Sequence, residues 1–279
     1  MKTFRLIGFA LSAIVFCITA CKNDVEELPI HETEIKLTCK VTPSRVTSLD
    51  YQSTQIVEGQ RVGVTITDAQ NEHNNVAWTV GTDGALNNTG SPIYWGEDQV
   101  TITAYHPYKS TWTDNEFSVS TDQSTDAGYL SSDLLWTSTT ASIIDAPVPL
   151  NFTHKLAKIN VTITSEDIED LSNVTICICG TNIFTGFNPT TGALSNVEGT
   201  IADIKAGVTT DRAYTSSAII VPQTVEKGTK FIKLTHGNKN YYYTLPQKME
   251  YQSGHSYNYT LKIDNSNIEN PVEGEESEW

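Results

Sequence analysis

Hydrophobic and polar residues alternate in short runs along most of the chain, and Gly, Pro, Asn or Asp residues separate these runs. Alternation with a period of two is typical of β-strands that are buried on one face, whereas long runs with helical periodicity are hard to find. Many short strands of this kind are typical of a β-sandwich or barrel. The pattern predicts strands over Glu34–Thr42, Arg61–Thr67, Val76–Val80, Val100–Tyr105, Lys158–Thr164, Val174–Cys179, Ser217–Val221, Lys230–Thr235, Asn240–Leu245 and Ser256–Ile263.

The first predicted strand, Glu34–Thr42, alternates clearly between apolar and polar residues. Its apolar side chains belong to Ile35, Leu37, Cys39 and Val41, which a β-strand places on one face. Such a strand can fill the core of a sandwich with that face, and the alternation also specifies its register.

The chain is too long for one small sandwich and fits two. A loop rich in Ser, Thr and Asp ends near Ala146–Pro149, and an apolar segment begins at Leu150. We therefore expect an all-β protein with an N-terminal β-sandwich domain over residues 34–149 and a C-terminal one over residues 150–264.

The last residues, 265–279, show little alternation, since they are acidic and contain Pro271. A Pro inside a run argues against a paired central strand. The sequence therefore predicts an acidic flexible tail over residues 265–279.

The first residues have the composition of an export signal. Lys2 and Arg5 precede an apolar run that ends just before Cys21, and this run is too short for a membrane span. We expect a signal peptide over residues 1–20, and Thr-Ala-Cys at its end is similar to the bacterial lipobox, in which the Cys receives lipid. An ordinary signal peptide is the alternative. Residues 21–33 include an acidic run and are expected to form a solvated tether.

The charge of the chain argues against one class of partner. With 18 Lys and Arg against 33 Asp and Glu, the formal net charge is −15. Because nucleic-acid binding requires a basic surface, we expect no nucleic-acid partner.

The cysteines and motifs indicate neither a metal site nor an active site. Besides Cys17 and Cys21, the chain has Cys39, Cys177 and Cys179, an odd number that cannot all pair. Cys177 and Cys179 are two positions apart in the chain and are expected to be small buried apolar residues rather than metal ligands. No zinc-protease, nucleophile-elbow, phosphate-loop or calcium-loop motif occurs. We therefore expect no enzyme activity and no cofactor.

Several motifs, in order along the chain, resemble those of the fimbrillin family of Bacteroidetes, the subunits of type V pili and their lipoprotein relatives. The residues that carry the resemblance are Gly63-Val64 after Glu58-Gly59, Pro92–Trp95, Val100–Tyr108, Asp133–Leu135, Phe152–Ile159, Ile220–Gln223 and Gly254–Tyr259.

This resemblance implies two transthyretin-like β-sandwich domains in tandem and assembly by strand addition. In the family, a lipoprotein precursor is cut by an Arg-specific protease after its first strand, and a strand of the next subunit fills the groove. The corresponding cut here lies between Arg45 and Val46, and the displaced strand carries Ile35, Leu37, Cys39 and Val41. A permanent first strand, with Arg45 as an ordinary loop residue, remains the alternative.

The partners that the resemblance implies are other fimbrillin subunits, the outer membrane through lipid on Cys21, and a host or bacterial surface ligand. The expected location is the cell surface as an outer-membrane lipoprotein, and the fimbrium after processing. Because residues 265–279 alternate poorly, a tip or accessory subunit is expected rather than a stalk subunit. The alternative function is a glycan- or ligand-binding lipoprotein that does not polymerise, in which Trp112 lies in a polar stretch and stacks on a ligand.

Overall fold

The computed structural model describes residues 32–42, 56–112, 114–166, 168, 170–171, 173–196, 199–208, 214–263 and 268–279. Within these ranges the protein is built of β-strands, with a short α-helix, α1 (Asp126–Ser132), and a 3-10 helix, η2 (Ile143–Asp145). The all-β prediction is confirmed. Among the described residues, no helix has the length and apolar character needed to cross a membrane.

The first group of strands forms an eight-stranded sheet with the order β10-β1-β6-β5-β4-β7-β9-β11. Its two edge strands, β10 and β11, are separated by only two residues in the chain, so the sheet curves round until its edges approach each other. The strands are β1 (Leu37–Cys39), β4 (Arg61–Thr67), β5 (Glu72–Val80), β6 (Ala85–Asn88), β7 (Gln99–His106), β9 (Leu135–Ser142), β10 (Val148–Leu150) and β11 (Thr153–His154).

The second group contains a five-stranded sheet, β17-β18-β12-β23-β24, and a four-stranded sheet, β16-β13-β20-β21. Side chains of both sheets share one hydrophobic cluster, so the two sheets pack face to face. The strands are β12 (Ala157–Thr164), β13 (Thr175–Asn182), β16 (Ile201–Lys205), β17 (Gly207–Val208), β18 (Tyr214–Ile220), β20 (Lys230–His236), β21 (Lys239–Thr244), β23 (His255–Ile263) and β24 (Ile268–Glu278).

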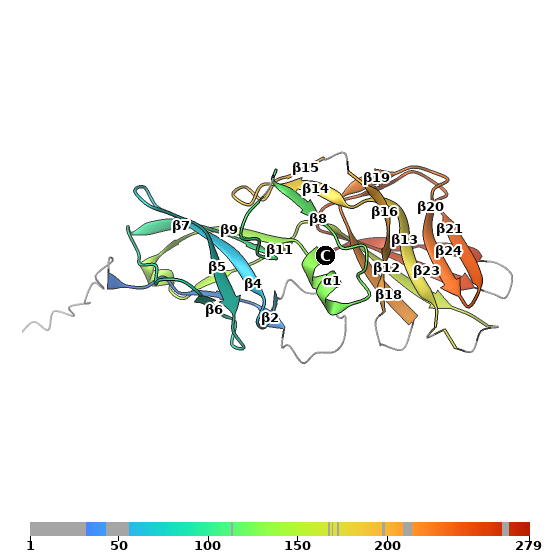
Figure 1. The fold of residues 1–279 in the computed structure, drawn as a ribbon, viewed down its shortest axis with the longest axis horizontal. Coiled ribbons are helices and arrows are strands. Elements are labelled where there is room, and N and C mark those ends of the chain that lie inside the picture. The colour runs from blue at the N-terminus through green and yellow to red at the C-terminus, as the bar shows by residue number, and fades with distance from the viewer. Residues whose placement is uncertain are drawn as a thin grey trace, which may run out of the picture.

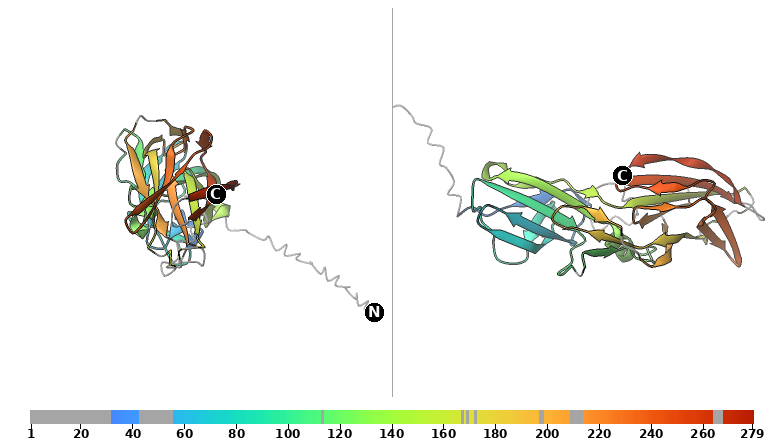
Figure 2. Two further views of the ribbon diagram at one scale, coloured as in Figure 1. Left: turned by 90° about the vertical axis from the view of Figure 1, so that its right-hand side faces the viewer. Right: turned by 90° about the horizontal axis from the view of Figure 1, so that it is seen from above.

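Smaller sheets complete the fold, and the two groups of strands follow one another along the long axis of the molecule (Figures 1 and 2). The smaller sheets comprise β15-β14-β8, β19-β22 and β2-β3. Their strands are β2 (Val41–Thr42), β3 (Ile56–Val57), β8 (Glu116–Ser118), β14 (Phe184–Phe187), β15 (Leu194–Ser195), β19 (Gln223–Val225) and β22 (Met249–Tyr251).

Two hydrophobic clusters of buried side chains correspond to the two groups of strands. The first lies inside the eight-stranded sheet, from Ile35 to Phe152. The second contains residues from Leu156 to Ile263, together with five residues from earlier in the chain: Tyr105, Phe117, Val119, Tyr129 and Leu134. The chain segment between β7 and β9 therefore packs mainly on the second group, although it lies within the range expected for the N-terminal domain.

The prediction of a flexible tail over residues 265–279 is wrong. Ile268–Glu278 forms β24, the outermost strand of its sheet, and pairs antiparallel with β23 from Ile263↔Ile268 to His255↔Glu278. Register shifts interrupt this pairing at two places. An edge strand accommodates a Pro, since one side of its backbone has no strand partner. The pairing follows from the exposed edge of β23 rather than from alternation in the tail.

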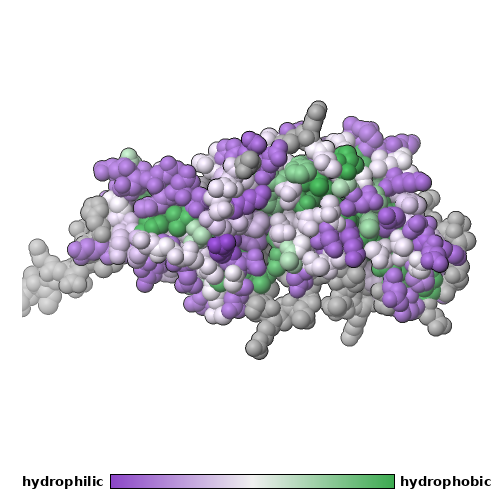
Figure 3. All heavy atoms as spheres, in the orientation of Figure 1, coloured by the Kyte–Doolittle hydropathy of each residue, from purple (hydrophilic) through white to green (hydrophobic). Residues whose placement is uncertain are grey.

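The molecular surface is mainly polar on the face shown in Figure 3, and its hydrophobic residues form separate patches. One of these patches lies over the region of β14 (Figures 1 and 3). Ile201, the first residue of β16, is 63% exposed.

Candidate functional site

The strand β1 lies in the interior of the eight-stranded sheet, between β10 and β6. It pairs in parallel with β10 from Leu37↔Val148 to Cys39↔Leu150, and antiparallel with β6 at Leu37↔Leu86. At its end, the backbone N–H of Cys39 donates a hydrogen bond of 2.8 Å to the carbonyl of Gly84. A segment from the beginning of the chain thus joins two strands that are distant from it in sequence.

The side chains of this segment follow the predicted alternation where they are described. Ile35 and Leu37 are each only 1% exposed and belong to the first hydrophobic cluster, whereas Glu34 and Lys36 are exposed. Cys39 is half-buried and packs against the same cluster. Burial raises the pKa of its thiol to about 11, so that the thiol is protonated at neutral pH.

The fourth apolar residue of the predicted strand lies in a separate short strand. Val41 belongs to β2, which pairs in parallel with β3 at Val41↔Ile56. The first strand expected over Glu34–Thr42 is therefore divided between two sheets. Cys21, Arg45 and Val46 lie outside the described residues, so their predicted roles remain predictions.

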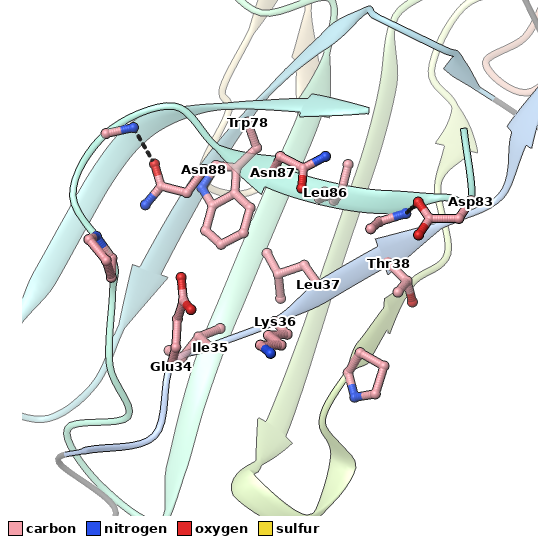
Figure 4. Close-up of a pocket in the computed structure, with 14 residues that line it drawn as sticks. Glu34, Ile35, Lys36, Leu37, Thr38, Trp78, Asp83, Leu86, Asn87 and Asn88 are labelled. Carbon is pink, nitrogen blue, oxygen red and sulfur yellow. Dashed lines mark hydrogen bonds between the residues drawn. The ribbon is translucent and has the colours of Figure 1, made fainter. Parts of the chain in front are cut away.

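A cleft of about 530 Å³ lies beside β1, where the chain before it separates from β6. The separation occurs because the preceding residues pair elsewhere: the N–H of Ile35 donates to the carbonyl of Ile93 at 2.8 Å, and Glu34 forms a bridge with Tyr94. Figure 4 shows the indole of Trp78 in this cleft, next to Leu37 and below β6.

The lining of this cleft is apolar in its depth and polar at its rim. Trp78, Leu86 and Leu37 are buried, whereas Lys36 and Asn87 are exposed. The cleft follows the border between β1 and β6, whose pairing is limited to Leu37↔Leu86 and Thr38↔Ala85.

Trp112, the predicted stacking residue, lies outside this cleft and is half-buried. Its Nε1 donates a hydrogen bond of 2.9 Å to the hydroxyl of Tyr105, and its ring centroid lies 5.3 Å from that of Phe187. The Nζ of Lys109 lies 4.7 Å from the centroid of the same ring. Trp112 is therefore part of an aromatic cluster, with only a portion of its ring accessible.

The thiols of Cys177 and Cys179 are free and lie in β13. Cys179 is buried and its Sγ donates to the carbonyl of Cys177 at 3.7 Å. Desolvation raises the pKa of both thiols, that of Cys179 to about 12. Both side chains are therefore neutral at physiological pH. Cys179 is buried as expected, whereas Cys177 is only half-buried.

A buried polar cluster joins the end of the chain to the middle, and the sequence contained no signal for it. His154 Nδ1 lies 2.8 Å from Asp133 Oδ1, and His106 Nδ1 lies 3.2 Å from the carbonyl oxygen of Asp133. The indole of Trp279 stacks on His154 with centroids 3.7 Å apart and an interplanar angle of 13°. The C-terminus accordingly lies near the middle of the molecule (Figures 1 and 2).

Burial lowers the pKa of His106, which is 2% exposed, and the nearby Asp133 partly opposes this shift. The ring of His106 is therefore neutral at pH 7. This cluster holds β11, the segment after α1 and the C-terminus together, which is a structural role.

Solved structures similar to this one come from Bacteroides. A putative cell adhesion protein from Bacteroides uniformis matches with a TM-score of 0.66 and 21% identity, covering 88% of this chain and 97% of that one. A putative cell adhesion protein from Bacteroides ovatus matches with a TM-score of 0.68 and 20% identity, covering 88% and 98%.

A further similar structure is the tip fimbrial protein Mfa3 from Porphyromonas gingivalis, with a TM-score of 0.50, 13% identity and coverage of 88% and 100%. At these identities the likeness shows the fold. No curated protein matches the sequence significantly.

A sequence model described as "Fimbrillin-like" matches residues 44–279, which is most of the chain. The expected resemblance is thereby confirmed. The chain belongs to the fimbrillin-like family, whose members are structural and adhesion proteins of surface pili rather than enzymes.

Proposed function

We propose that this protein is a tip or accessory pilus subunit that accepts a strand of another subunit in place of β1. The observation that carries the proposal is the position of β1, a three-residue strand in the interior of a sheet. Once residues 34–45 have left, β10 and β6 both present unpaired backbone edges above an open core. An incoming extended strand can then pair with both edges.

The energetics of β1 support a strand that stays in place until the chain is cut. Burying Ile35 and Leu37 contributes about 1.5–3 kcal/mol each, since both are 1% exposed. In the intact chain, covalent linkage also keeps β1 next to its partners. After a cut between Arg45 and Val46, only noncovalent contacts retain it, and another strand can compete for the same groove.

The C-terminal strand supports an accepting rather than a donating role. β24 is paired with β23, and Trp279 at its end stacks on His154, so this segment is engaged within its own subunit. A subunit that accepts a strand but keeps its own C-terminal strand terminates a filament. The similarity to a tip fimbrial protein agrees with this role.

The remaining parts of the proposal concern anchoring and domain structure. The precursor carries lipid on Cys21 after removal of residues 1–20, residues 21–33 act as a tether, and the lipoprotein reaches the outer membrane. Its two transthyretin-like sandwich domains meet near residues 149–150. The two separate hydrophobic clusters support this division.

Intact mass measurement and N-terminal sequencing of the protein from the cell surface test the cleavage. The expected result is a new N-terminus at Val46 in the assembled protein and a lipidated Cys21 in the precursor. An Arg45→Lys variant should resist an arginine-specific protease, whereas Arg61→Lys, at the exposed start of β4, should be cut like the wild type. Assembled protein that retains the whole chain from Cys21 would refute strand replacement.

A second candidate function is binding of a surface glycan without polymerisation. The observation that favours it is a polar pocket beside Trp112, with a volume of about 330 Å³.

A further inference from the structure

A pocket of about 330 Å³ lies at the junction between the two groups of strands, and we refer to it as the Trp112 pocket. One wall comes from β4, β5 and the segment after β7, and the other comes from the connection between β14 and β15. Its lining residues are Thr65, Asn74, Asn75, Tyr105, Ser110, Thr111, Trp112, Pro189 and Thr190.

Among the residues that the structure describes, the lining of the Trp112 pocket carries no charged side chain. It combines hydroxyl and amide groups, which both donate and accept hydrogen bonds, with the rings of Trp112, Tyr105 and Pro189. The Nζ of Lys109 lies 4.7 Å from the centroid of the Trp112 ring and donates to the carbonyl of Glu116 at 3.2 Å, and Lys109 is not part of the lining. This chemistry suits a neutral ligand with many hydroxyl groups, since the described lining offers no ion partner to phosphates, acidic sugars or cations.

A β-bulge places two amide side chains at the pocket. Between the pairs Val64↔Val76 and Ile66↔His73, the single residue Thr65 faces both Asn74 and Asn75. Asn75 has a left-handed backbone angle, φ 51°, a conformation that Asn adopts more readily than most residues. Bulges redirect side chains and are common beside functional sites.

Hydrogen bonds hold this wall in a fixed shape. Asn75 Nδ2 donates to the carbonyl of Lys109 at 2.9 Å, and the Tyr105 hydroxyl donates to Asn75 Oδ1 at 2.6 Å. Trp112 Nε1 donates to the same Tyr105 hydroxyl at 2.9 Å. Thr65 Oγ1 donates to Asn74 Oδ1 at 3.1 Å and accepts from the N–H of Asn75 at 3.0 Å. These bonded groups position the wall, and the hydroxyls of Ser110, Thr111 and Thr190 are left for a ligand.

The opposite wall is held just as firmly. Trp136 Nε1 donates to the carbonyl of Pro189 at 2.9 Å, and the N–H of Thr190 donates to Asn188 Oδ1 at 2.9 Å. Gly192 allows the loop to lie against Trp136, because a Cβ at this position would come within 2.4 Å of the indole. The pocket is thus formed in advance, as ligand sites at junctions between parts of a protein commonly are.

We propose that the Trp112 pocket binds a neutral carbohydrate, with the accessible part of the Trp112 ring against a sugar ring and the hydroxyl and amide groups around its hydroxyls. β5 pairs with β6 only over Trp78–Val80. An extended peptide along β5 at Asn74 and Asn75 is therefore the competing ligand, and absence of binding to every neutral glycan would favour it. This inference deepens the second candidate function and requires surface display but no polymerisation.

Two neighbouring Thr residues in the β14–β15 connection provide a matched pair of variants. Thr190 and Thr191 are both exposed, but only Thr190 lines the pocket. Thr190→Trp places an indole in the cavity while leaving the backbone hydrogen bond to Asn188 in place. Thr191→Trp adds the same side chain to the same loop outside the pocket and controls for effects on folding.

The experiment uses the uncut chain from Lys22 to Trp279 as a monomer. It is applied to an array of neutral and sialylated oligosaccharides, and titration calorimetry with the best neutral oligosaccharide gives the affinity. We expect binding to neutral glycans, loss of at least about tenfold in affinity in Thr190→Trp, and a change below about twofold in Thr191→Trp.

Absence of binding to every neutral glycan, binding only to sialylated ones, or equal binding by Thr190→Trp would overturn the inference. Because the assay needs neither cleavage at Arg45 nor a second subunit, its failure leaves strand replacement at β1 untouched. Conversely, an uncut chain in assembled pili would refute strand replacement without affecting this result.

Discussion

Truncation of Leu37 to Ala should accelerate the loss of β1 from a chain that has been cut at Arg45. Leu37 is 1% exposed and belongs to the first hydrophobic cluster, so its side chain contributes to retaining the strand. Leu-to-Ala changes in cores cost about 2–5 kcal/mol. The adjacent cleft of about 530 Å³ places Leu37 at the border of the core, which favours the lower part of this range, about 2–3 kcal/mol.

A loss of about 2–3 kcal/mol corresponds to roughly 30- to 140-fold weaker retention of the strand. The assay is gel filtration of the cut protein at successive times, with mass spectrometry to quantify the released N-terminal peptide. Trp78 provides a second signal, since it is 2% exposed beside Leu37 and its fluorescence should shift when β1 leaves.

Lys36→Ala is the matched control, because Lys36 is the neighbouring residue of the same segment and its side chain is exposed. Surface substitutions of this kind change stability by about 0.5 kcal/mol or less. If Leu37→Ala and Lys36→Ala released the peptide equally fast, the face of β1 that enters the core would not be what holds the strand.

Three further predictions concern stability. Gln123→Ala should lower the free energy of unfolding by about 2–4 kcal/mol. The Gln123 side chain accepts from the N–H of Ile219 at 2.7 Å and donates to its carbonyl at 2.8 Å, and the variant leaves both groups unpaired. An unchanged midpoint of urea unfolding would contradict this. Protonation of His106 in the unfolded chain should lower the stability of the protein from pH 7 to pH 5. The pKa of His106 is lowered in the folded state, so below about pH 6.5 the unfolded chain binds a proton that the folded protein does not. His106→Gln should weaken this pH dependence, and an unchanged slope of stability against pH would exclude His106 as its source. Trp279→Ala should increase the rate of amide hydrogen exchange in β24 at least about fivefold, because it removes the stacking on His154. Glu278→Ala is the control, since Glu278 is the neighbouring residue and is exposed, and it should leave the exchange rate unchanged. Equal exchange rates in the two variants would refute an anchoring role for Trp279.

The sequence predicted the all-β fold class and many of the strands, because alternation is a local property of the chain. The strand expected over Ser256–Ile263 corresponds to β23, and the one expected over Arg61–Thr67 has the bounds of β4. Strands with few apolar residues escaped prediction. β9, for example, runs through a segment rich in Ser and Thr, and its pairing with β7 rather than its own pattern makes it a strand.

For the candidate sites, too, the sequence predicted local features, whereas contacts between distant segments appeared only in the structure. The alternation that places Ile35 and Leu37 in the core was evident from the sequence, whereas the cleft beside them depends on where the chain leaves β6. The polar stretch around Trp112 suggested an exposed ring, whereas the structure half-buries it, and stacking of Trp112 on a ligand stays a prediction. Trp112 contacts Phe187 of β14, which lies far along the chain, and no local pattern encodes this contact.

The sequence by itself determined which segments can form strands and which face of each is apolar, since these depend on neighbouring residues alone. It also determined membership of the fimbrillin-like family, through motifs that occur in order along the chain. Only the tertiary structure decided which strand edges are free. The acidic segment after residue 264 became β24 because β23 had an edge to pair with, and Trp279 found a buried partner in His154. Backbone pairing and packing between distant segments depend on the position of the partner, which the local sequence of either segment does not contain.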